Sequence, residues 1–216
     1  MTILINNRVP TVSCMQRLNA LFRPVERYAD AVSPKTHGIV AVVSLCSFIG
    51  VIVLGFVPVT RQIEMSGYST SDLQDATSRA EVDTILQALE PVMDHVMLLS
   101  VLDYIFILAG FFLFFSLHSI ILNTLDSHDR LVLIPKIGMI LTISSRLFDS
   151  LENLWVILIY TNPEDYATVL ISLMNASETV KWTLVRVEYP MLGLAIVLVL
   201  LIRFTSLFDG HSEHLR

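Results

Sequence analysis

Several ionisable side chains interrupt stretches that are otherwise apolar, and their spacing places them on shared helix faces. Asp149, Glu152 and Asn153 are three and four residues apart, so a helix carries all three on one side. Arg146 lies one turn before Asp149, and we expect the two to pair. Carboxylates and bases placed together in an apolar setting can form ion pairs, exchange protons or hold a cation.

A second apolar run supplies possible partners. Lys181 and Glu188 are seven residues apart and share a helix face, and a neighbouring stripe carries Trp182, Arg186 and Tyr189. A third run contains Asp103. We expect Lys181 or Arg186 to pair with Glu152 or Asp103.

Acids outnumber bases at the depth where these side chains are expected. There are five acids and three bases: Asp94, Asp103, Asp149, Glu152 and Glu188, against Arg146, Lys181 and Arg186. Either one or two acids are protonated at neutral pH, or a cation completes the set. The predicted buried network is Asp103, Arg146, Asp149, Glu152, Asn153, Lys181, Arg186 and Glu188, with Asp94, His95, Trp182 and Tyr189 at its periphery.

The composition identifies the class of protein that positions these groups. The chain has 216 residues, of which 54% are hydrophobic and 16% charged, and its mean hydropathy is +0.66. Soluble domains are about one-quarter charged. A net charge of −6 excludes a nucleic-acid binder. We therefore predict an integral membrane protein that contacts the lipid bilayer.

The apolar runs define four expected membrane spans, at about 38–59, 96–122, 131–160 and 180–204. Within 137–160, twelve Leu, Ile, Val and Phe residues favour insertion by about −6 kcal/mol in total. The three charges Arg146, Asp149 and Glu152 oppose insertion by about +9 kcal/mol if they face lipid. This span therefore needs partners inside the bundle, or neutralisation of its acids by protonation.

The distribution of basic residues predicts the orientation. Nine Lys and Arg residues fall on one side of the expected spans, namely Arg8, Arg17, Arg23, Arg27, Lys35, Arg130, Lys136, Arg203 and Arg216. Only Arg61 and Arg79 fall on the other side. Both termini are therefore expected in the cytoplasm, in a multi-pass protein of the plasma or inner membrane. No uncharged polar track is expected to continue from the charged level to the cytoplasmic side.

The segments outside the spans predict further helices. Residues 15–32 have the spacing of an amphipathic interfacial helix, with a break near Pro24. Segment 60–95 has the pattern of a helical extracytoplasmic cap, with capping boxes beginning at Ser71 and Ser78. Asn162 followed by proline and acids predicts another helix start.

The expected fold is all-α: an antiparallel bundle of four transmembrane helices, with the amphipathic N-terminal helix and the cap. Its parts are a cytoplasmic N-terminal segment, a membrane domain and a cytoplasmic tail: 1–37, 38–206 and 207–216.

A resemblance follows from three short motifs: Ser145–Leu154 (SRLFDSLENL), Ser177–Trp182 (SETVKW) and Leu102–Tyr104 (LDY). The chain resembles a family of small four-helix membrane proteins with an Asp-x-x-Glu-Asn helix and a Thr-x-Lys-Trp helix. The likeness covers roughly residues 40–185. It implies the same architecture and singles out Asp103, Asp149, Glu152, Asn153 and Lys181, but it implies no biochemical activity.

Three functions stay open from sequence alone. The network can be an interhelical clamp or interaction module, since polar side chains commonly hold membrane helices together. It can bind or translocate a cation, a proton or a small polar solute. It can also be a carboxylate-dependent membrane enzyme, although the sequence has no His-Glu-x-x-His, Gly-x-Ser-x-Gly or glycine-rich phosphate motif. We predict no metal site and no cofactor. A homo-oligomer, another membrane protein and a cation are the partners left open.

Overall fold

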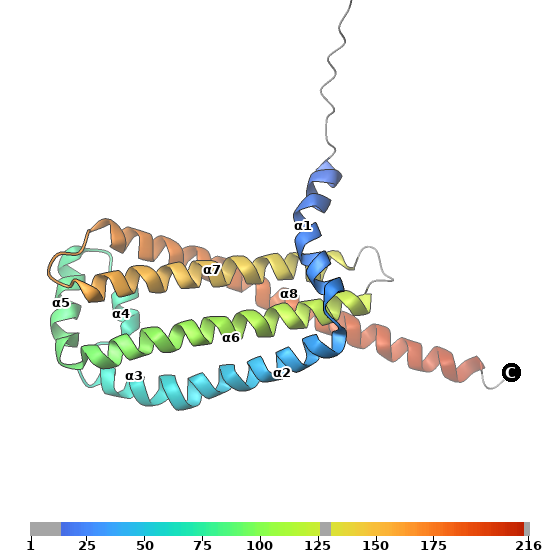
Figure 1. The fold of residues 1–216 in the computed structure, drawn as a ribbon, viewed down its shortest axis with the longest axis horizontal. Helices are drawn as coiled ribbons and strands as arrows, with labels where there is room; N and C mark the ends of the chain where they lie inside the picture. Colours follow the sequence, from blue (N-terminus) through green and yellow to red (C-terminus); the bar gives the residue numbers. More distant parts are fainter. Residues whose placement is uncertain (1–13, 126–130, 214–216) are drawn as a thin grey trace, which may run out of the picture.

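The computed structural model describes residues 14–125 and 131–213, and their regular structure is helical throughout (Figure 1). Arg8, Arg130 and Arg216, which entered the orientation count, lie outside these residues. In chain order the helices are α1 (Cys14–Ala31), α2 (Pro34–Gly50), a π-helical segment (Val51–Phe56), α3 (Val57–Glu64), α4 (Thr70–Asp75), α5 (Arg79–Leu89), a 3₁₀ turn (Glu90–Val92), α6 (Met93–Leu125), α7 (Leu133–Thr161) and α8 (Val169–Glu213).

The long helices lie in a row. α7 packs along both α6 and α8, and α6 packs along α2. α2 and α8 stand at the two ends of this row and have no comparable contact with each other. α4 and α5 cover one end of the row, which we call the cap end, whereas α1 crosses the other end (Figure 1).

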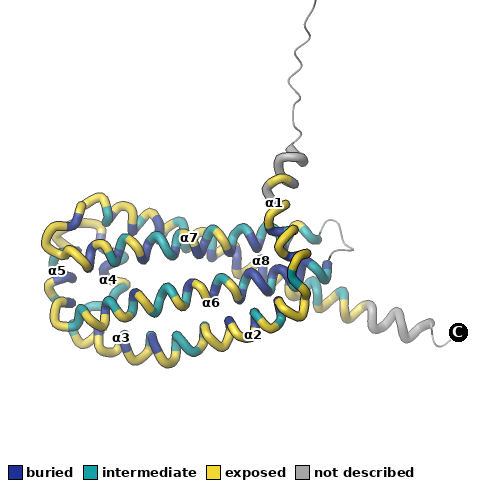
Figure 2. The backbone as a smooth tube through the Cα atoms, in the orientation of Figure 1, coloured by how far each residue is buried: buried dark blue, intermediate teal, exposed yellow. Residues whose placement is uncertain are grey.

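Three stretches are long and apolar enough to cross a membrane: Pro34–Glu64, Arg79–Leu125 and Val169–Thr205. α7, which corresponds to the expected span 131–160, does not qualify by composition because it contains Arg146, Asp149 and Glu152. Large hydrophobic side chains are exposed along α2 and α8 (Figure 2): Val42, Val43, Ile49, Leu194, Val197 and Leu201.

The first long helix runs from Pro34 to Glu64 and includes a π turn. Pro58 has no N–H group, so the carbonyl of Leu54 cannot receive the usual α-helical bond. The N–H of Val57 instead bonds the carbonyl of Ile52, five residues earlier. A Cβ at Gly55 would lie 3.1 Å from Leu102 Cδ1, so a glycine there lets α6 approach closely. The turn directs Phe56 and Thr60 toward the interior of the row.

The cap is built from capping boxes and a shared hydrophobic core. The box at Ser78 is present as expected, and Glu81 closes it. The box expected at Ser71 is wrong by two residues. Ser69 is extended, accepts the N–H of Asp72 on its hydroxyl and donates its own N–H to Asp72 at 2.6 Å. Apolar side chains of the cap are buried with those of the long helices: Leu73, Val82, Ile85, Leu86 and Leu89, against Ile63, Ile159, Ile171 and Met174.

The helix start expected at Asn162 is also wrong, because α8 begins at Val169. Asn162 instead closes a turn in which its side-chain amide donates to the carbonyl of Asp165 at 2.9 Å. This turn brings Tyr166 against α5, where its hydroxyl donates to Asp83 at 2.8 Å. Burial and the nearby carboxylate of Asp83 raise the pKa of Tyr166 to about 12. The tertiary contact therefore outweighs the local helix signal.

α1 is continuous through Pro24, so the expected break there is wrong. Pro24 and Ala20, whose carbonyl loses its bond, are both exposed, and solvent can satisfy the freed group. The apolar face of α1 packs on the protein: Phe22, Val25 and Ala29 are buried against Phe115, Leu122 and Met139. An ion pair of 2.6 Å between Lys136 and Glu26 adds a second tie to α7.

The register of the first cap predicts a contrast between two serines. Ser69→Ala removes a helix N-cap worth about 1 kcal/mol, so the amides at the start of α4 should exchange hydrogen about fivefold faster. Ser71→Ala is the matched control and should leave the exchange unchanged, because Ser71 is exposed and caps no helix. Hydrogen–deuterium exchange on the detergent-solubilised full chain measures both. A larger effect of Ser71→Ala would contradict the register described here.

The same cap predicts a pH dependence. Bonds from the backbone N–H and hydroxyl of Ser69 hold the pKa of Asp72 below its usual value. The capping contribution of Asp72 should therefore be complete above the usual aspartate pKa and decline as the pH falls through the lowered value. Protection of the α4 amides should fall in that acidic window in the wild-type chain and change less in Asp72→Asn, which removes the titrating carboxyl. An equal decline in both chains would show that Asp72 is not the responsible group.

Candidate charged cavity

Lys181 connects α8 to two successive turns of α7. Its Nζ lies 2.6 Å from Glu152 Oε2 and 3.3 Å from Asp149 Oδ1. All three side chains are largely buried, with 13% of Lys181 and 2% of Glu152 exposed. The pairing expected between Lys181 and Glu152 is present. These contacts hold α7 and α8 in one register.

The second oxygen of each carboxylate also has a partner. Arg146 Nη1 lies 3.5 Å from Asp149 Oδ2, as the spacing of these residues predicted. The Gln74 amide, from α4 in the cap, donates to Glu152 Oε1 at 2.7 Å. Buried charges cost several kcal/mol each unless they are paired and hydrogen-bonded. The two carboxylates meet the pairing part of this condition, and Gln74 ties the cap to the long helices. Arg146 Nε is buried without a hydrogen-bond partner among the described residues.

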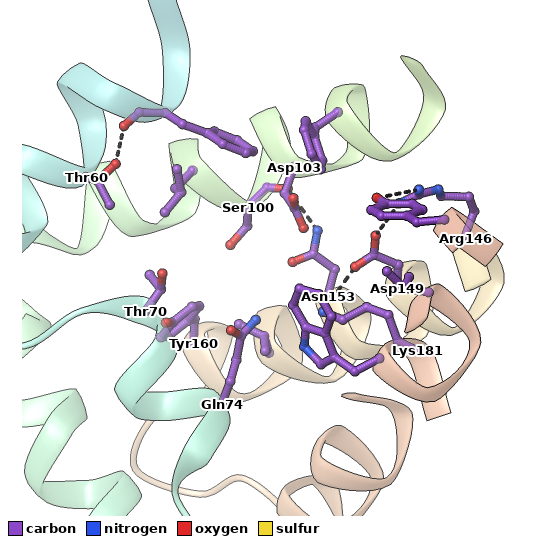
Figure 3. A pocket seen from close by; sticks show the side chains of 17 residues that line it. Thr60, Thr70, Gln74, Ser100, Asp103, Arg146, Asp149, Asn153, Tyr160 and Lys181 are labelled. Carbon is purple, nitrogen blue, oxygen red and sulfur yellow. Dashed lines mark hydrogen bonds and ion pairs between the residues drawn. The ribbon is translucent and has the colours of Figure 1, made fainter. Parts of the chain in front are cut away.

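A cavity of about 350 Å³ lies beside this cluster (Figure 3). α6 forms one wall, α7 the next and α8 the third, while α3 and α4 contribute side chains at the cap end. Its polar lining comprises Thr60, Thr70, Gln74, Ser100, Asp103, Arg146, Asp149, Asn153, Tyr160, Lys181, Trp182 and Tyr189. Its apolar lining comprises Phe56, Leu99, Phe106, Val156 and Val185.

Asp103 lines the cavity from α6, across from the clustered side chains of α7 and α8 (Figure 3). Within the described part of the chain it forms no ion pair or hydrogen bond, so the pairing of Asp103 with a base is not formed. Asn153, its neighbour across the cavity, donates to the carbonyl of Ser100 at 3.5 Å. The sequence predicted that Asp103 lies at the same depth as the charged side chains of α7 and α8, and it lines the same cavity. The base that was expected to pair with it does not do so among the described residues.

Tyr160 was not singled out by the sequence, although it lines the same cavity. Only 4% of the residue is exposed, and its hydroxyl has no hydrogen-bond partner in the described residues. Leaving a buried hydroxyl unpaired costs about 1–3 kcal/mol. The Tyr160 residue thus borders the cavity, while its hydroxyl is buried and unpaired within the described residues.

Arg146 is positioned by aromatic side chains as well as by Asp149. Its guanidinium lies 5.3 Å from the ring centre of Phe114, and Nη2 donates to the Tyr189 hydroxyl at 3.4 Å. Phe114 and Tyr189 stack with ring centres 5.1 Å apart. Lys181 likewise lies 5.3 Å from the ring centre of Trp182. These cation–π contacts lower the cost of holding the two bases away from water.

Glu188 is fully buried but does not belong to the Lys181 cluster, contrary to the predicted network. Its two oxygens accept hydrogen bonds of 2.7 Å from Thr142 and Ser145. It lies seven residues beyond Lys181, which is about 10 Å along a helix. Two residues on the same face of a helix therefore need not belong to the same site.

Buried polar groups continue past Glu188, toward the end of the row that α1 crosses. His118 is fully buried, and neither ring nitrogen has a partner in the described residues. A Cβ at Gly138 would lie 2.1 Å from the His118 ring. The glycine therefore makes the space that this imidazole occupies.

Arg186, Asp94 and His95 lie outside the cluster. Arg186 is exposed and forms no ion pair with any described residue. The buried stripe of α8 is carried by Lys181, Val185, Glu188 and Leu192, and position 186 is rotated off that stripe. Asp94 and His95 are exposed at the start of α6. Among the residues described, no group of three or more His, Cys, Asp or Glu side chains is placed to hold a metal ion.

The buried cluster predicts a large cost for removing its cation. Lys181→Met should lower the free energy of unfolding by about 3–5 kcal/mol, because two buried carboxylates lose their shared partner. Lys136→Met is the matched control, since it removes a more exposed ion pair with Glu26 and should cost at most about 1 kcal/mol. Equilibrium unfolding in mixed micelles measures both. A smaller loss for Lys181→Met than for Lys136→Met would contradict the clamp.

Comparison with protein-family models, with curated proteins and with solved structures finds no match to this chain. The resemblance inferred from the three short motifs stays a prediction.

Proposed function

We propose that the chain is an integral membrane protein with four spans, formed by α2 with α3, α6, α7 and α8. The three apolar stretches support this proposal directly. The charges of α7 do not oppose it, because Arg146, Asp149 and Glu152 are all buried inside the row. The exposed large side chains of α7 are apolar: Leu133, Ile143, Leu147, Leu154 and Leu158. α7 can therefore face lipid on one side and the cavity on the other.

The distribution of basic residues supports an orientation with the cap outside the cytoplasm. Arg61 and Arg79 belong to the cap end, whereas Arg23, Arg27 and Lys35 belong to or follow α1 at the opposite end. Basic residues favour the cytoplasmic side of a membrane. Both termini would then be cytoplasmic, in the plasma or inner membrane.

The function that the geometry supports best is the binding of a small cation or cationic solute in the cavity. The observation behind it is Asp103, the one charged side chain of the lining without a partner among the described residues. Arg146, Asp149 and Lys181, which also line the cavity, are all paired. Cationic ligands are recognised by carboxylates in partly dry sites, where the attraction is stronger than in water.

The charge balance supports the same proposal. Three acids, Asp103, Asp149 and Glu152, stand with two bases, Arg146 and Lys181, which leaves one negative charge in excess. A single positive charge would balance the site. In this reading the Lys181 cluster holds the wall of the cavity in place.

A second candidate is a purely structural clamp or interaction module without a ligand. The complete pairing of Asp149 and Glu152 favours it, since polar side chains between membrane helices commonly serve as ties. No observation of comparable weight favours transport or catalysis. The two candidates differ in one respect: only the binding proposal needs Asp103 to carry a negative charge.

The test compares Asp103→Asn with Asp94→Asn in the full chain. Asp94 is an exposed acid at the start of the same helix, α6, so its variant controls for the general loss of a negative charge. Thermal unfolding is followed during titration with potassium, sodium, ammonium and methylammonium chlorides. At ten times the Kd, a bound cation should add about 1.4 kcal/mol, or roughly 3–5 °C in Tm. The shift should persist in Asp94→Asn and vanish in Asp103→Asn. Equal shifts in both variants, or none in the wild-type chain, would refute cation binding and leave the clamp.

A further inference from the structure

The cavity opens beside α8. Of all its lining residues, only Trp182 and Tyr189 are exposed, at 48% and 44%. Both belong to α8, in the stretch apolar enough to cross a membrane. The cap end is covered by Thr70 and Gln74 of α4. The mouth therefore lies on the side of the row, beside α8, rather than at the cap end.

An exposed cation stands at this mouth. Arg186 is four residues after Trp182 and three before Tyr189, so the three side chains are neighbours on the surface of α8. Arg186 lies six residues inside the expected span 180–204, and arginine within a membrane span is almost always paired. No described residue supplies an anion to Arg186. The partner that this position needs therefore comes from outside the described chain.

Two kinds of group are thus exposed together on α8, the guanidinium of Arg186 and the aromatic rings of Trp182 and Tyr189. The two rings also line the cavity, whose opposite wall carries the carboxylate of Asp103. Guanidinium groups bind phosphate through paired hydrogen bonds. Aromatic faces attract ammonium groups, and a carboxylate pairs with them. This set of groups matches a molecule with a phosphate next to an ammonium.

We propose that the mouth binds the headgroup of a zwitterionic phospholipid. The phosphate pairs with Arg186, and the ammonium passes between the aromatic rings toward Asp103. The lipid is favoured over a soluble phosphate ester because the mouth faces the apolar lateral surface, where acyl chains would lie. This inference deepens the proposed cation site and rests on it, because Asp103 supplies the charge for the ammonium.

The experiment measures Tm of the detergent-solubilised full chain with added dihexanoyl-phosphatidylethanolamine. Dihexanoyl-phosphatidylglycerol is the comparison lipid without an ammonium, and ethanolamine and inorganic phosphate are the soluble fragments. The variants are Arg186→Gln and Asp103→Asn, with Arg61→Gln as the control at another exposed arginine. All three positions are exposed or face the cavity, and Gln and Asn keep most of the original side-chain shape.

Phosphatidylethanolamine should stabilise the wild-type chain and Arg61→Gln more than phosphatidylglycerol does. Arg186→Gln and Asp103→Asn should each weaken its apparent affinity by about tenfold, the effect of losing one charge-assisted hydrogen bond. Neither soluble fragment should reproduce the full effect, because each supplies only half of the contacts.

Each contrary result has a separate meaning. If ethanolamine stabilises the chain through Asp103 but Arg186→Gln behaves like Arg61→Gln, the lipid inference is wrong and the cation site stands. If no ammonium compound acts through Asp103, both proposals fail. If phosphatidylglycerol matches phosphatidylethanolamine in every variant, the mouth recognises an anionic headgroup only, and the inference is overturned.

Discussion

The structure depends on one constraint: charge buried in an apolar helix bundle must be paired. α7 carries two carboxylates on successive turns of its inner face, and α8 carries the lysine that reaches both. Because Lys181 contacts Asp149 and Glu152 together, it fixes the register of α8 against α7. The hydrogen bond from the Gln74 amide to Glu152 links the cap to the same ion pairs, so the pairing also helps to position the cap.

The pairing also decides which surfaces remain for a ligand and for lipid. With its charges turned inward, α7 presents leucine and isoleucine to the outside. The paired side chains form one side of the cavity, while Asp103 of α6 forms another and stays unpaired within the described chain. The π turn before Pro58 brings Phe56 and Thr60 to the cap end of this space. A rigid, charged wall facing a lone carboxylate is the arrangement expected of a binding site for a positive group.

Sequence reasoning predicted the long helices, which depend on local periodicity, and it included the pair of Lys181 with Glu152 among its alternatives, but not the contact of Lys181 with Asp149. The ion pair of Arg146 with Asp149 follows from a spacing of three residues.

Sequence reasoning failed where contacts between distant parts of the chain determine the structure. Gln74 lies in a cap whose packing no spacing reveals, and Arg186 shares a stripe with residues that line the cavity yet points off the buried face. Asn162 has a strong local helix signal, but the bond between Tyr166 and Asp83 keeps the chain in a turn. The hydroxyls at Thr142 and Ser145 were visible at heptad spacing with Asp149 and Glu152, and could have located Glu188.

The coupling between Lys181 and Glu152 tests the central claim most directly. A double-mutant cycle with Lys181→Met, Glu152→Gln and the combined variant measures it through unfolding free energies in mixed micelles. If the pair fixes the register of α7 and α8, the coupling energy should be about 2 kcal/mol or more. Additive losses within about 0.5 kcal/mol would show that the two residues act independently. The claim that this pair clamps α7 to α8 and holds the cavity wall would then be wrong.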